Sequence, residues 1–361
     1  MRITFIAPHA DTSGGARVTH IYARKLQERG HEVTVVMRPP PPRTLRARLS
    51  SLVKGRGWPA RVPMLASHYD PDCYAIRTVD RVRPIVAHDL PDADVVIATW
   101  WETAEWMHAM PPSKGRQVHF IQHYEAFDNI PRARVDAVLA TPNFKITISR
   151  WLDELLRERF GCTDVALVLN SVDTDQFHAP PRGRQPQPTV GMLYSVAAWK
   201  DCRTGFAAFE QFRQAVPDAR LIAFGGYPVE PHLPLPDGAR YVMQPAQDRI
   251  RDLYAACDVW LCPSMVEGFG LPSLEAMACR TPVVTTPVGA WPDLVKDGEN
   301  GFLVPVGDPA AMAARLGHVA TLPDAAWRRL SDGAYRTATG YSWDDAATAF
   351  EAALMRAVLH P

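Results

Sequence analysis

The sequence predicts an α/β protein of two successive domains, each a parallel β-sheet covered by helices. Three observations indicate this fold class. The chain has 361 residues, more than one ordinary hydrophobic core organises. Short apolar segments alternate with helical patterns, an order typical of parallel sheets. A polar, proline-rich segment at residues 178–188 (HAPPRGRQPQP) interrupts this alternation, which then starts again, so we interpret it as a linker.

The first domain is expected to span residues 1–177 and to begin with a strand–helix–strand unit. Residues 3–7 are an apolar run, residues 16–29 have a helical pattern, and residues 32–37 are predicted to form the next strand. The loop between them contains Gly14 and Gly15, where the backbone can approach a ligand closely. Ligands gather where such loops leave the carboxyl ends of strands, so the pair is a candidate cleft site; a plain turn is the alternative.

Polar and aromatic residues follow two later strands of this domain, predicted at 94–99 and 117–122. Trp100 and Trp101 come after the first, and their rings could stack on a sugar or on a flat acceptor. Partial burial in the core is the other interpretation of these tryptophans. His123 and Glu125 come after the second strand. A histidine there could hydrogen-bond a hydroxyl group of a ligand, although a lone histidine is more often structural.

The second domain is expected to span residues 189–342. Strands are predicted at 189–194, 219–224, 241–243, 258–262 and 283–286, and helices at 203–216 and 247–256. Lys200 lies in the loop after the first of these strands, and Gly225 and Gly226 follow the second. Two α/β domains joined by a linker predict a cleft between them.

The most informative stretch lies between Glu267 and Glu275, where a strand has ended and a helix begins. Pro272 suits the first helical position, and free amides near Gly270, Leu271 and Ser273 would attract an anion such as a phosphate. Each carboxylate can accept hydrogen bonds from a vicinal diol. The pattern indicates a nucleotide-sugar site. The alternative is a solvated loop glutamate and a first-turn glutamate favoured by the helix dipole.

This region resembles the signature of the family 4 glycosyltransferases. The resemblance is carried by Pro263-Ser264, Glu267-Gly-Phe-Gly-Leu-Pro, Glu275-Ala-Met-Ala and Thr281-Pro-Val-Val. It implies the GT-B fold, in which two Rossmann-like domains face each other across a cleft. It also implies that a C-terminal helix, at about residues 343–361, crosses back to the N-terminal domain.

The resemblance assigns roles to named residues. It implies a catalytic set of Glu267, Lys200 and His123. The expected acceptor or cleft residues are Gly14, Gly15, Trp100, Trp101 and Glu125. The expected donor-binding residues are Glu275, Gly268, Phe269, Gly270, Leu271, Ser273, Gly225, Gly226 and Arg203. The family places an arginine near Val190-Gly191, where this chain has Met192; Arg203 could substitute, although from a different position.

The implied reaction moves a sugar from a nucleotide-diphosphate sugar to an acceptor hydroxyl with retention of anomeric configuration. No metal and no cofactor are expected. Two alternatives stay open: a non-catalytic nucleotide-sugar-binding scaffold subunit, and a sugar-nucleotide epimerase of the same fold. The sequence does not identify the donor sugar, its base, the acceptor or the oligomeric state.

Composition restricts the partners and the location. Lys and Arg together number 39, as do Asp and Glu, so no basic field predicts a nucleic-acid partner. The six cysteines have no CxxC spacing and predict reduced thiols. The absence of a signal-like start predicts a cytoplasmic protein. Residues 43–57 combine an apolar helical stripe with arginines and lysine, which predicts either peripheral contact with the inner face of the membrane or an ordinary basic surface helix.

Overall fold

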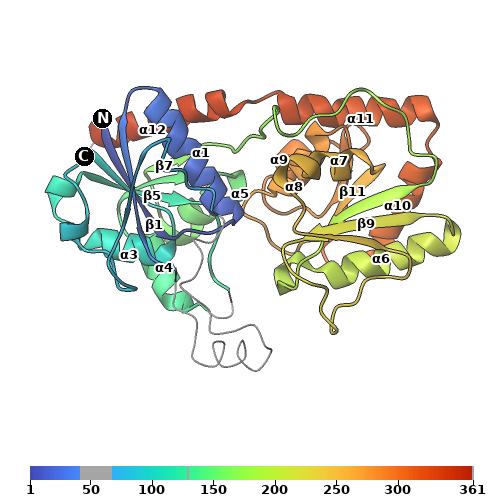
Figure 1. The fold of residues 1–361 in the computed structure, drawn as a ribbon, viewed down its shortest axis with the longest axis horizontal. Helices are drawn as coiled ribbons and strands as arrows, with labels where there is room; N and C mark the ends of the chain where they lie inside the picture. The colour runs from blue at the N-terminus through green and yellow to red at the C-terminus, as the bar shows by residue number, and fades with distance from the viewer. Residues whose placement is uncertain (41–66, 128–129, 360–361) are drawn as a thin grey trace. The chain divides into compact units, whose positions relative to one another are not determined.

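The computed structural model describes residues 1–40, 67–127 and 130–359. The chain forms two compact units (Figure 1). The first unit contains Met1–Thr147, Leu152–Val168 and Ala347–Pro361, and the second contains Ile148–Trp151 and Leu169–Ala346. The segment at 43–57, for which membrane contact was one interpretation, lies outside the described residues. Within the described residues, no helix has the length and apolar character needed to cross a bilayer.

The first unit is built on a seven-stranded sheet with the strand order β3-β2-β1-β4-β5-β6-β7, and every neighbouring pair is parallel. Its strands are β1 (Arg2–His9), β2 (Glu32–Arg38), β3 (Ala75–Thr78), β4 (Val95–Ala98), β5 (Arg116–Ile121), β6 (Phe144–Thr147) and β7 (Val165–Leu167). Its helices include α1 (Gly14–Glu28), α3 (Trp101–His108), α4 (Arg132–Ala140) and α5 (Arg150–Glu154), which continues as a π-helical turn at Leu155–Arg159.

Sequence and burial agree closely in the first strand–helix–strand unit. Five consecutive residues of β1 and five of β2 are buried, as expected for central strands covered on both faces. Ser13 caps α1 by accepting a hydrogen bond from the backbone N–H of Ala16 at 3.2 Å. Strand β3 was not predicted, because it is a four-residue edge strand with mostly exposed side chains.

The second unit contains a six-stranded parallel sheet with the order β10-β9-β8-β11-β12-β13. Its strands are β8 (Thr189–Leu193), β9 (Arg220–Gly225), β10 (Arg240–Met243), β11 (Val259–Cys262), β12 (Val283–Thr285) and β13 (Gly301–Leu303). Its helices include α6 (Cys202–Ala215), α7 (Ile250–Ala255), α8 (Leu271–Ala278), α9 (Trp291–Leu294), α10 (Pro309–Thr321) and α11 (Asp324–Thr339).

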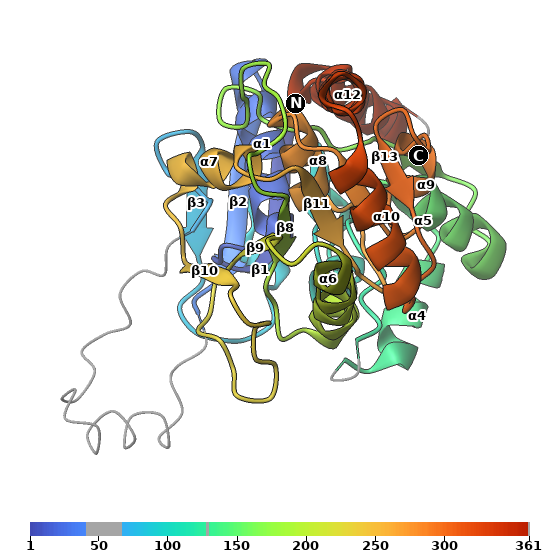
Figure 2. The same cartoon turned by 90° about the vertical axis from the view of Figure 1, so that its right-hand side faces the viewer.

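Helices cover both faces of this second sheet. Helices α6 and α10 lie side by side on one face (Figure 2), where Phe206 and Phe209 share a buried cluster with Met312 and Leu316. Helices α7, α8 and α11 lie on the opposite face (Figure 1). The two-sided cover leaves the loops at the carboxyl ends of the strands as the place where polar side chains gather.

The C-terminal helix α12 (Trp343–Leu359) returns to the first unit, as the resemblance implied. The ring of Phe350 stacks on Tyr22 of α1 with a centroid distance of 4.2 Å and also contacts Phe120 of β5 at 5.1 Å. Glu351 accepts hydrogen bonds from His31 Nε2 at 2.8 Å and from Arg29 at 3.0 Å. Apolar stacking and charged hydrogen bonds together attach the end of the chain to α1.

The division of the chain differs from the expected boundary at residue 177. The segment from Leu169 onward belongs to the second unit. Its contacts explain why: Ser171 Oγ donates to the backbone oxygen of Tyr341 at 2.6 Å, and the ring of Phe177 lies 6.0 Å from that of Tyr254. The proline-rich composition marks where the strand–helix pattern of the sequence is interrupted. Side-chain packing places the boundary between the two units earlier in the chain.

Candidate functional site

The site is assembled at one edge of the second sheet, where three loops leave the carboxyl ends of β8, β11 and β12. These strands are neighbours in the sheet, so their loops come together although they are distant in sequence. The backbone N–H of Met265, after β11, donates to the oxygen of Trp199, after β8, at 2.7 Å. The backbone N–H of Ala290, after β12, donates to the oxygen of Phe269 at 3.1 Å. These bonds fix the three loops to one another.

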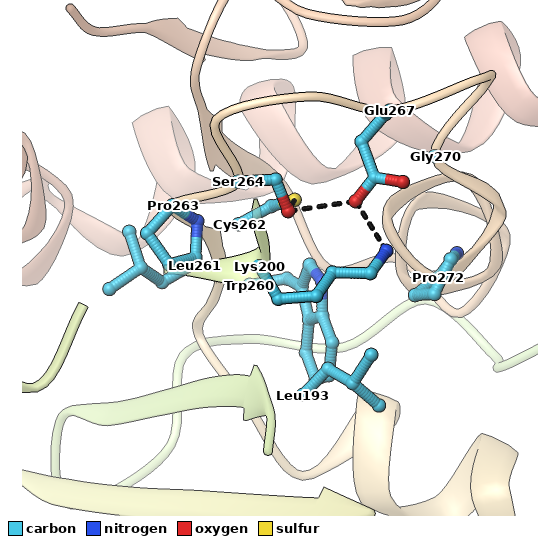
Figure 3. A pocket seen from close by; sticks show the side chains of 10 residues that line it. All are labelled: Leu193, Lys200, Trp260, Leu261, Cys262, Pro263, Ser264, Glu267, Gly270 and Pro272. Carbon is cyan, nitrogen blue, oxygen red and sulfur yellow. Dashed lines mark hydrogen bonds and ion pairs between the residues drawn. The ribbon is translucent and has the colours of Figure 1, made fainter. Parts of the chain in front are cut away.

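Glu267 is the centre of a hydrogen-bonded set (Figure 3). Lys200 Nζ donates to Glu267 Oε1 at 2.6 Å, and Ser264 Oγ donates to the same oxygen at 2.7 Å. The side chain of Glu267 is nearly buried, so both donors compensate for the loss of water around its charge. Both donors contact Oε1, and no donor among the described residues contacts Oε2.

Lys200 keeps its charge in this setting. Burial by itself lowers the pKa of Lys200, but the neighbouring Glu267 carboxylate, through its charge and its hydrogen bond, outweighs burial and raises the pKa above its usual value. The ammonium is therefore protonated at neutral pH. The site presents a cation and a carboxylate in contact, each already oriented by the other.

A pocket adjoins this set and reaches the start of α8. Figure 3 shows Pro272 and Gly270 on one side of the Lys200 ammonium and Ser264 on the other. The apolar part of the wall comes from β8, β11 and the loop after β11. The residues that line the pocket are Leu193, Lys200, Trp260, Leu261, Cys262, Pro263, Ser264, Glu267, Gly270 and Pro272.

Helix α8 begins at this pocket. Gly270 is the N-cap residue, with φ at 107°, a left-handed conformation that glycine adopts without strain. The helix starts at Leu271, so Pro272 occupies its second position, one residue later than expected. The backbone N–H of Ser273 donates to the oxygen of Gly270 at 3.1 Å. Of the three amides predicted to be free, that of Ser273 is therefore engaged.

Glu275 lies one turn further along α8 and is nearly buried. Its Oε2 accepts a hydrogen bond from the hydroxyl of Tyr254 at 2.8 Å, and Tyr254 is itself packed between Phe224 and Trp260 on the buried side of α7. Packing thus fixes the tyrosine, and the tyrosine fixes the carboxylate. The structure places both predicted glutamates in one unit, where Glu267 Oε1 and Glu275 Oε2 accept hydrogen bonds from protein donors.

The Gly268 and Phe269 backbone is also fixed by hydrogen bonds. Ser149 Oγ donates to the oxygen of Gly268 at 2.8 Å, and Trp151 Nε1 donates to the same oxygen at 3.3 Å. The Phe269 side chain is buried, with 4% of its surface exposed. Both residues therefore hold the shape of the loop, while their side chains are not offered to a ligand.

Three further donor-binding expectations have a mixed outcome. Arg203 is exposed on α6 and donates to the backbone oxygen of His232 at 3.1 Å, so its guanidinium points toward that loop. Gly225 is buried at the end of β9, where a side chain would overlap the backbone oxygen of Tyr194. Gly226 is exposed, and its oxygen accepts from Gln244 at 3.0 Å. Close packing explains Gly225 without a ligand.

Met192 does not occupy a ligand-binding position. It is fully buried inside β8 and packs in the hydrophobic cluster of the second unit. The residues that follow the carboxyl end of β8 are Tyr194 and Ser195. Met192 therefore contributes to the hydrophobic core of the second unit.

In the first unit, Gly14 and Gly15 are the first two residues of α1, whereas the sequence predicted them in the loop before this helix. The oxygen of Gly15 accepts from Gln122 Nε2 at 3.2 Å, and a side chain at residue 15 would lie against that glutamine. Gly14 is exposed and has open space where a side chain would extend. The glycine pair thus borders the loop that contains His123.

Trp101 is not available for stacking on a ligand. Only 6% of its surface is exposed, and the Arg134 guanidinium lies over its ring at 4.7 Å. The core interpretation is the correct one for this residue. Trp100, the N-cap of α3, is half-buried, so part of its ring can still meet a ligand.

Glu125 and His123 both lie in the loop after β5. Glu125 is buried and accepts from the backbone N–H of Trp101 at 2.8 Å, so its carboxylate holds the start of α3. Burial raises the pKa of Glu125 well above its usual value, and the single backbone hydrogen bond opposes this only in part. His123 is partly exposed, and its Nδ1 lies 2.8 Å from the backbone oxygen of Tyr124. If Nδ1 carries the proton, Nε2 is the nitrogen that can accept one.

Two residues of the site were not assigned from the sequence. Ser264 was noted only as part of the family signature, and its hydrogen bond to Glu267 spans three residues, a spacing that could have suggested it. Tyr254 is 21 residues from Glu275 and belongs to no motif, so only the packing of α7 on α8 reveals it.

Comparisons with known proteins agree on the family. A family model described as "Glycosyltransferase Family 4" matches residues 12–176, and one described as "Glycosyl transferases group 1" matches residues 187–321. A D-inositol 3-phosphate glycosyltransferase of Streptomyces coelicolor is 31% identical over 262 residues, covering 60% of this chain and 56% of that protein. Other proteins of that name from Streptomyces and Salinispora align over only 22% to 26% of their length.

Solved structures match nearly the whole chain. Sucrose-phosphate synthase from Thermosynechococcus elongatus has a TM-score of 0.73 and 19% identity, over 98% of both chains. Anabaena HepE in complex with UDP-glucose has a TM-score of 0.70 and 17% identity, over 99% of both chains. At these identities the matches show a common fold.

Proposed function

This chain belongs to the family 4 glycosyltransferases and has their GT-B fold, and on that premise we propose that it transfers a sugar from a nucleotide-diphosphate sugar to an acceptor hydroxyl. The observation that carries the proposal is the set of Lys200, Ser264 and Glu267 beside the start of α8, with Glu275 fixed on the same helix. A cation, a helix N-terminus and two oriented carboxylates match the charge and hydroxyl pattern of a nucleotide sugar.

Each part of the donor has a counterpart in this set. The diphosphate lies at the start of α8 within reach of the Lys200 ammonium, which neutralises part of its charge. Glu275 accepts hydrogen bonds from the ribose diol, with Tyr254 holding the carboxylate in place. The free oxygen of Glu267 accepts a hydrogen bond from a hydroxyl of the transferred sugar. The two glutamates thereby fix the two ends of the donor.

The chemical step breaks the bond between the anomeric carbon and the β-phosphate oxygen and forms a bond from that carbon to the acceptor oxygen. The electrons of the broken bond leave with the diphosphate, so negative charge grows on the β-phosphate oxygen. Positive groups that already face this oxygen lower the activation free energy of the transfer. Lys200 and the start of α8 supply them. The proton of the acceptor hydroxyl passes to the departing phosphate on the same face, which gives retention and requires no separate base. Under this proposal no metal ion takes part.

Uridine is the base we propose for the donor. HepE and the pneumococcal O-GlcNAc transferase GtfA, which share the fold, were solved with UDP. In the first unit, His123 and the Gly14–Gly15 turn are proposed to contact the acceptor, because both lie at carboxyl ends of strands in that unit. Trp100 is the aromatic residue that remains partly exposed there.

The test combines binding and turnover. Calorimetry with UDP, GDP and dTDP, with and without EDTA, should show binding of UDP that EDTA leaves unchanged. Incubation with UDP-glucose or UDP-N-acetylglucosamine should then release UDP, slowly with water and faster with a suitable acceptor, and NMR of the product should show the donor's anomeric configuration. An absence of binding to all three nucleotides would overturn the proposal, and conversion of the donor sugar without UDP release would indicate the epimerase.

A further inference from the structure

Two buried polar side-chain atoms at the start of α8 have no hydrogen-bond partner among the described residues. They are Ser273 Oγ and Trp291 Nε1, and both residues have 0% of their surface exposed. An indole N–H can only donate, so its partner must be an acceptor. Burying a donor without an acceptor is unfavourable, and its presence here needs an explanation.

The fold holds Trp291 against the N-cap of α8. The preceding residue, Ala290, donates its backbone N–H to the oxygen of Phe269, and Gly289, with φ at 66°, packs so closely on Phe269 that any side chain would overlap its backbone. Trp291 then places its indole against Gly270: a Cβ atom on Gly270 would overlap Trp291 Nε1. The indole nitrogen therefore lies beside the residue that begins the helix.

We propose that the Trp291 indole N–H and the Ser273 hydroxyl donate hydrogen bonds to the diphosphate of the donor. This inference rests on the proposed function, since it names two further contacts of the same ligand. The groups gathered at this helix start are hydrogen-bond donors and a cation: Trp291, Ser273, the helix dipole and Lys200. Such a set selects an anion. A ribose or sugar hydroxyl is better matched by the carboxylates of Glu275 and Glu267.

The two side chains also supply hydrogen-bond donors at a helix start where the backbone offers few. The amide of Ser273 already donates to Gly270, and Pro272 has no N–H, so two of the first three helical residues offer no backbone donor to a phosphate. An indole N–H and a hydroxyl at the same helix start replace them. The sequence signature gives no indication of Trp291, because this residue lies outside it, at the start of α9 after β12.

The experiment compares UDP with uridine in the wild type and in Trp291→Phe. Phenylalanine keeps an aromatic ring and removes the N–H. We expect calorimetry to show UDP bound roughly ten- to a hundredfold more weakly by the variant, the range for a hydrogen bond to a charged group, with uridine affinity unchanged. Ser273→Ala should lower the affinity for UDP and leave the affinity for uridine unchanged. It provides a second variant with little change in side-chain volume.

Trp327→Phe is the matched control. The indole N–H of Trp327 donates to the backbone oxygen of Asp258 at 3.0 Å in the buried core of the same unit. Its loss should lower the melting temperature and leave UDP affinity unchanged. Trp291→Phe also replaces a fully buried indole with a smaller ring and should lower the melting temperature too, but only this variant should lose affinity for UDP.

The outcomes separate the two proposals. Unchanged UDP affinity in Trp291→Phe would overturn the diphosphate contact, because the indole N–H would then make no contact with the ligand. An equal loss of affinity for UDP and for uridine would also overturn it, because the indole would then act through packing. A wild-type protein that binds no nucleotide would overturn the proposed function itself, and the contact with it.

Discussion

At the scale of single residues, the two glutamates show how one side chain acquires different tasks. Glu267 shares one oxygen between a cation and a hydroxyl, whereas Glu275 shares one oxygen with a buried tyrosine. In the proposed function, the Lys200 cation next to Glu267 balances charge beside the departing diphosphate. Glu275 Oε2 accepts from the hydroxyl of Tyr254, and in the proposed function this carboxylate also accepts hydrogen bonds from the ribose diol. Their surroundings therefore predict different effects of mutation.

Substitution of the two glutamates should separate turnover from binding. Glu267→Gln keeps an oxygen for Lys200 and Ser264, so UDP affinity should change less than about threefold, while kcat should fall roughly a hundredfold or more with the loss of an oriented charge at the reacting sugar. Glu275→Ala should weaken UDP at least about a hundredfold, because two hydrogen bonds to a charged group are lost. Calorimetry and initial rates test both, and equal UDP affinity in wild type and Glu275→Ala would contradict the ribose assignment.

The burial of Glu125 leads us to expect an unusual dependence of stability on pH. Burial raises its pKa above the unfolded value of 4.5, so its stabilising contribution is complete below about pH 4.5 and is lost as pH rises through the folded pKa. Glu125→Gln still offers an oxygen to the N–H of Trp101. The variant should therefore be more stable than wild type at pH 7 to 8, by roughly 1–3 kcal/mol, and equal to it near pH 4.

Urea unfolding at the two pH values measures this difference. Glu102→Gln is the matched control, because Glu102 pairs with Arg38 at 2.8 Å and its neutralisation should lower stability at neutral pH. A Glu125→Gln protein that is less stable than wild type at pH 7 would contradict this argument, because it would show that the Glu125 carboxylate is ionised and paired with a cation in the folded protein.

At the scale of elements, the start of α8 depends on one backbone conformation. Gly270 has a left-handed φ and no room for a side chain beside Trp291, while Pro272 sets the first turn. The loop after β12 reaches this point through the Ala290–Phe269 hydrogen bond. Strand ends, a helix start and a neighbouring loop therefore form one rigid structural unit around the proposed diphosphate position.

Gly270→Ala should disturb both stability and donor binding. The φ of 107° is unfavourable for alanine and the new methyl group would overlap Trp291, so the free energy of unfolding should fall by more than about 2 kcal/mol. UDP affinity should fall with it. Gly317→Ala is the control: this glycine lies in α10 with open space around it, and alanine there should be neutral or stabilise by up to about 1 kcal/mol. Chemical denaturation measures both, and similar stabilities would contradict the argument.

At the scale of the whole molecule, the order of the chain and its folding units do not coincide. The first unit is completed by Ala347–Pro361, and the second unit includes Ile148–Trp151, whose side chains bind the oxygen of Gly268. Neither unit is thus a single continuous segment. The last helix is therefore a structural part of the first unit and not an appendage of the second.

Phe350→Ala should destabilise the first unit. The ring is fully buried against Tyr22 and Phe120, and truncation of a core phenylalanine costs about 3–5 kcal/mol. Met355→Ala, at a position 45% exposed on the same helix, should have little effect. Thermal unfolding measures the loss of stability, and calorimetry should still detect UDP binding by the second unit at low temperature. A Phe350→Ala protein as stable as wild type would contradict the assigned packing.

The strand–helix alternation and the stretch from Glu267 to Glu275 were readable from the sequence because they depend on local patterns. Apolar runs identified most central strands, and glycine, proline and glutamate spacing identified the start of α8. Strands β3 and β13 were not identified: each lies at an edge of its sheet, and the side chains of β3 are mostly exposed, so it lacks the apolar run of a central strand.

The sequence by itself determined the fold class and the family, and it predicted the two glutamates of the proposed site. Only the tertiary structure decided that Trp101 belongs to the core, that Met192 lies inside a strand, and that Tyr254 and Trp291 converge on α8. The physical reason is distance along the chain. A hydrogen bond or a contact between separate loops exists only when parallel strands bring their carboxyl ends together, and no local pattern of residues records which side chains then meet.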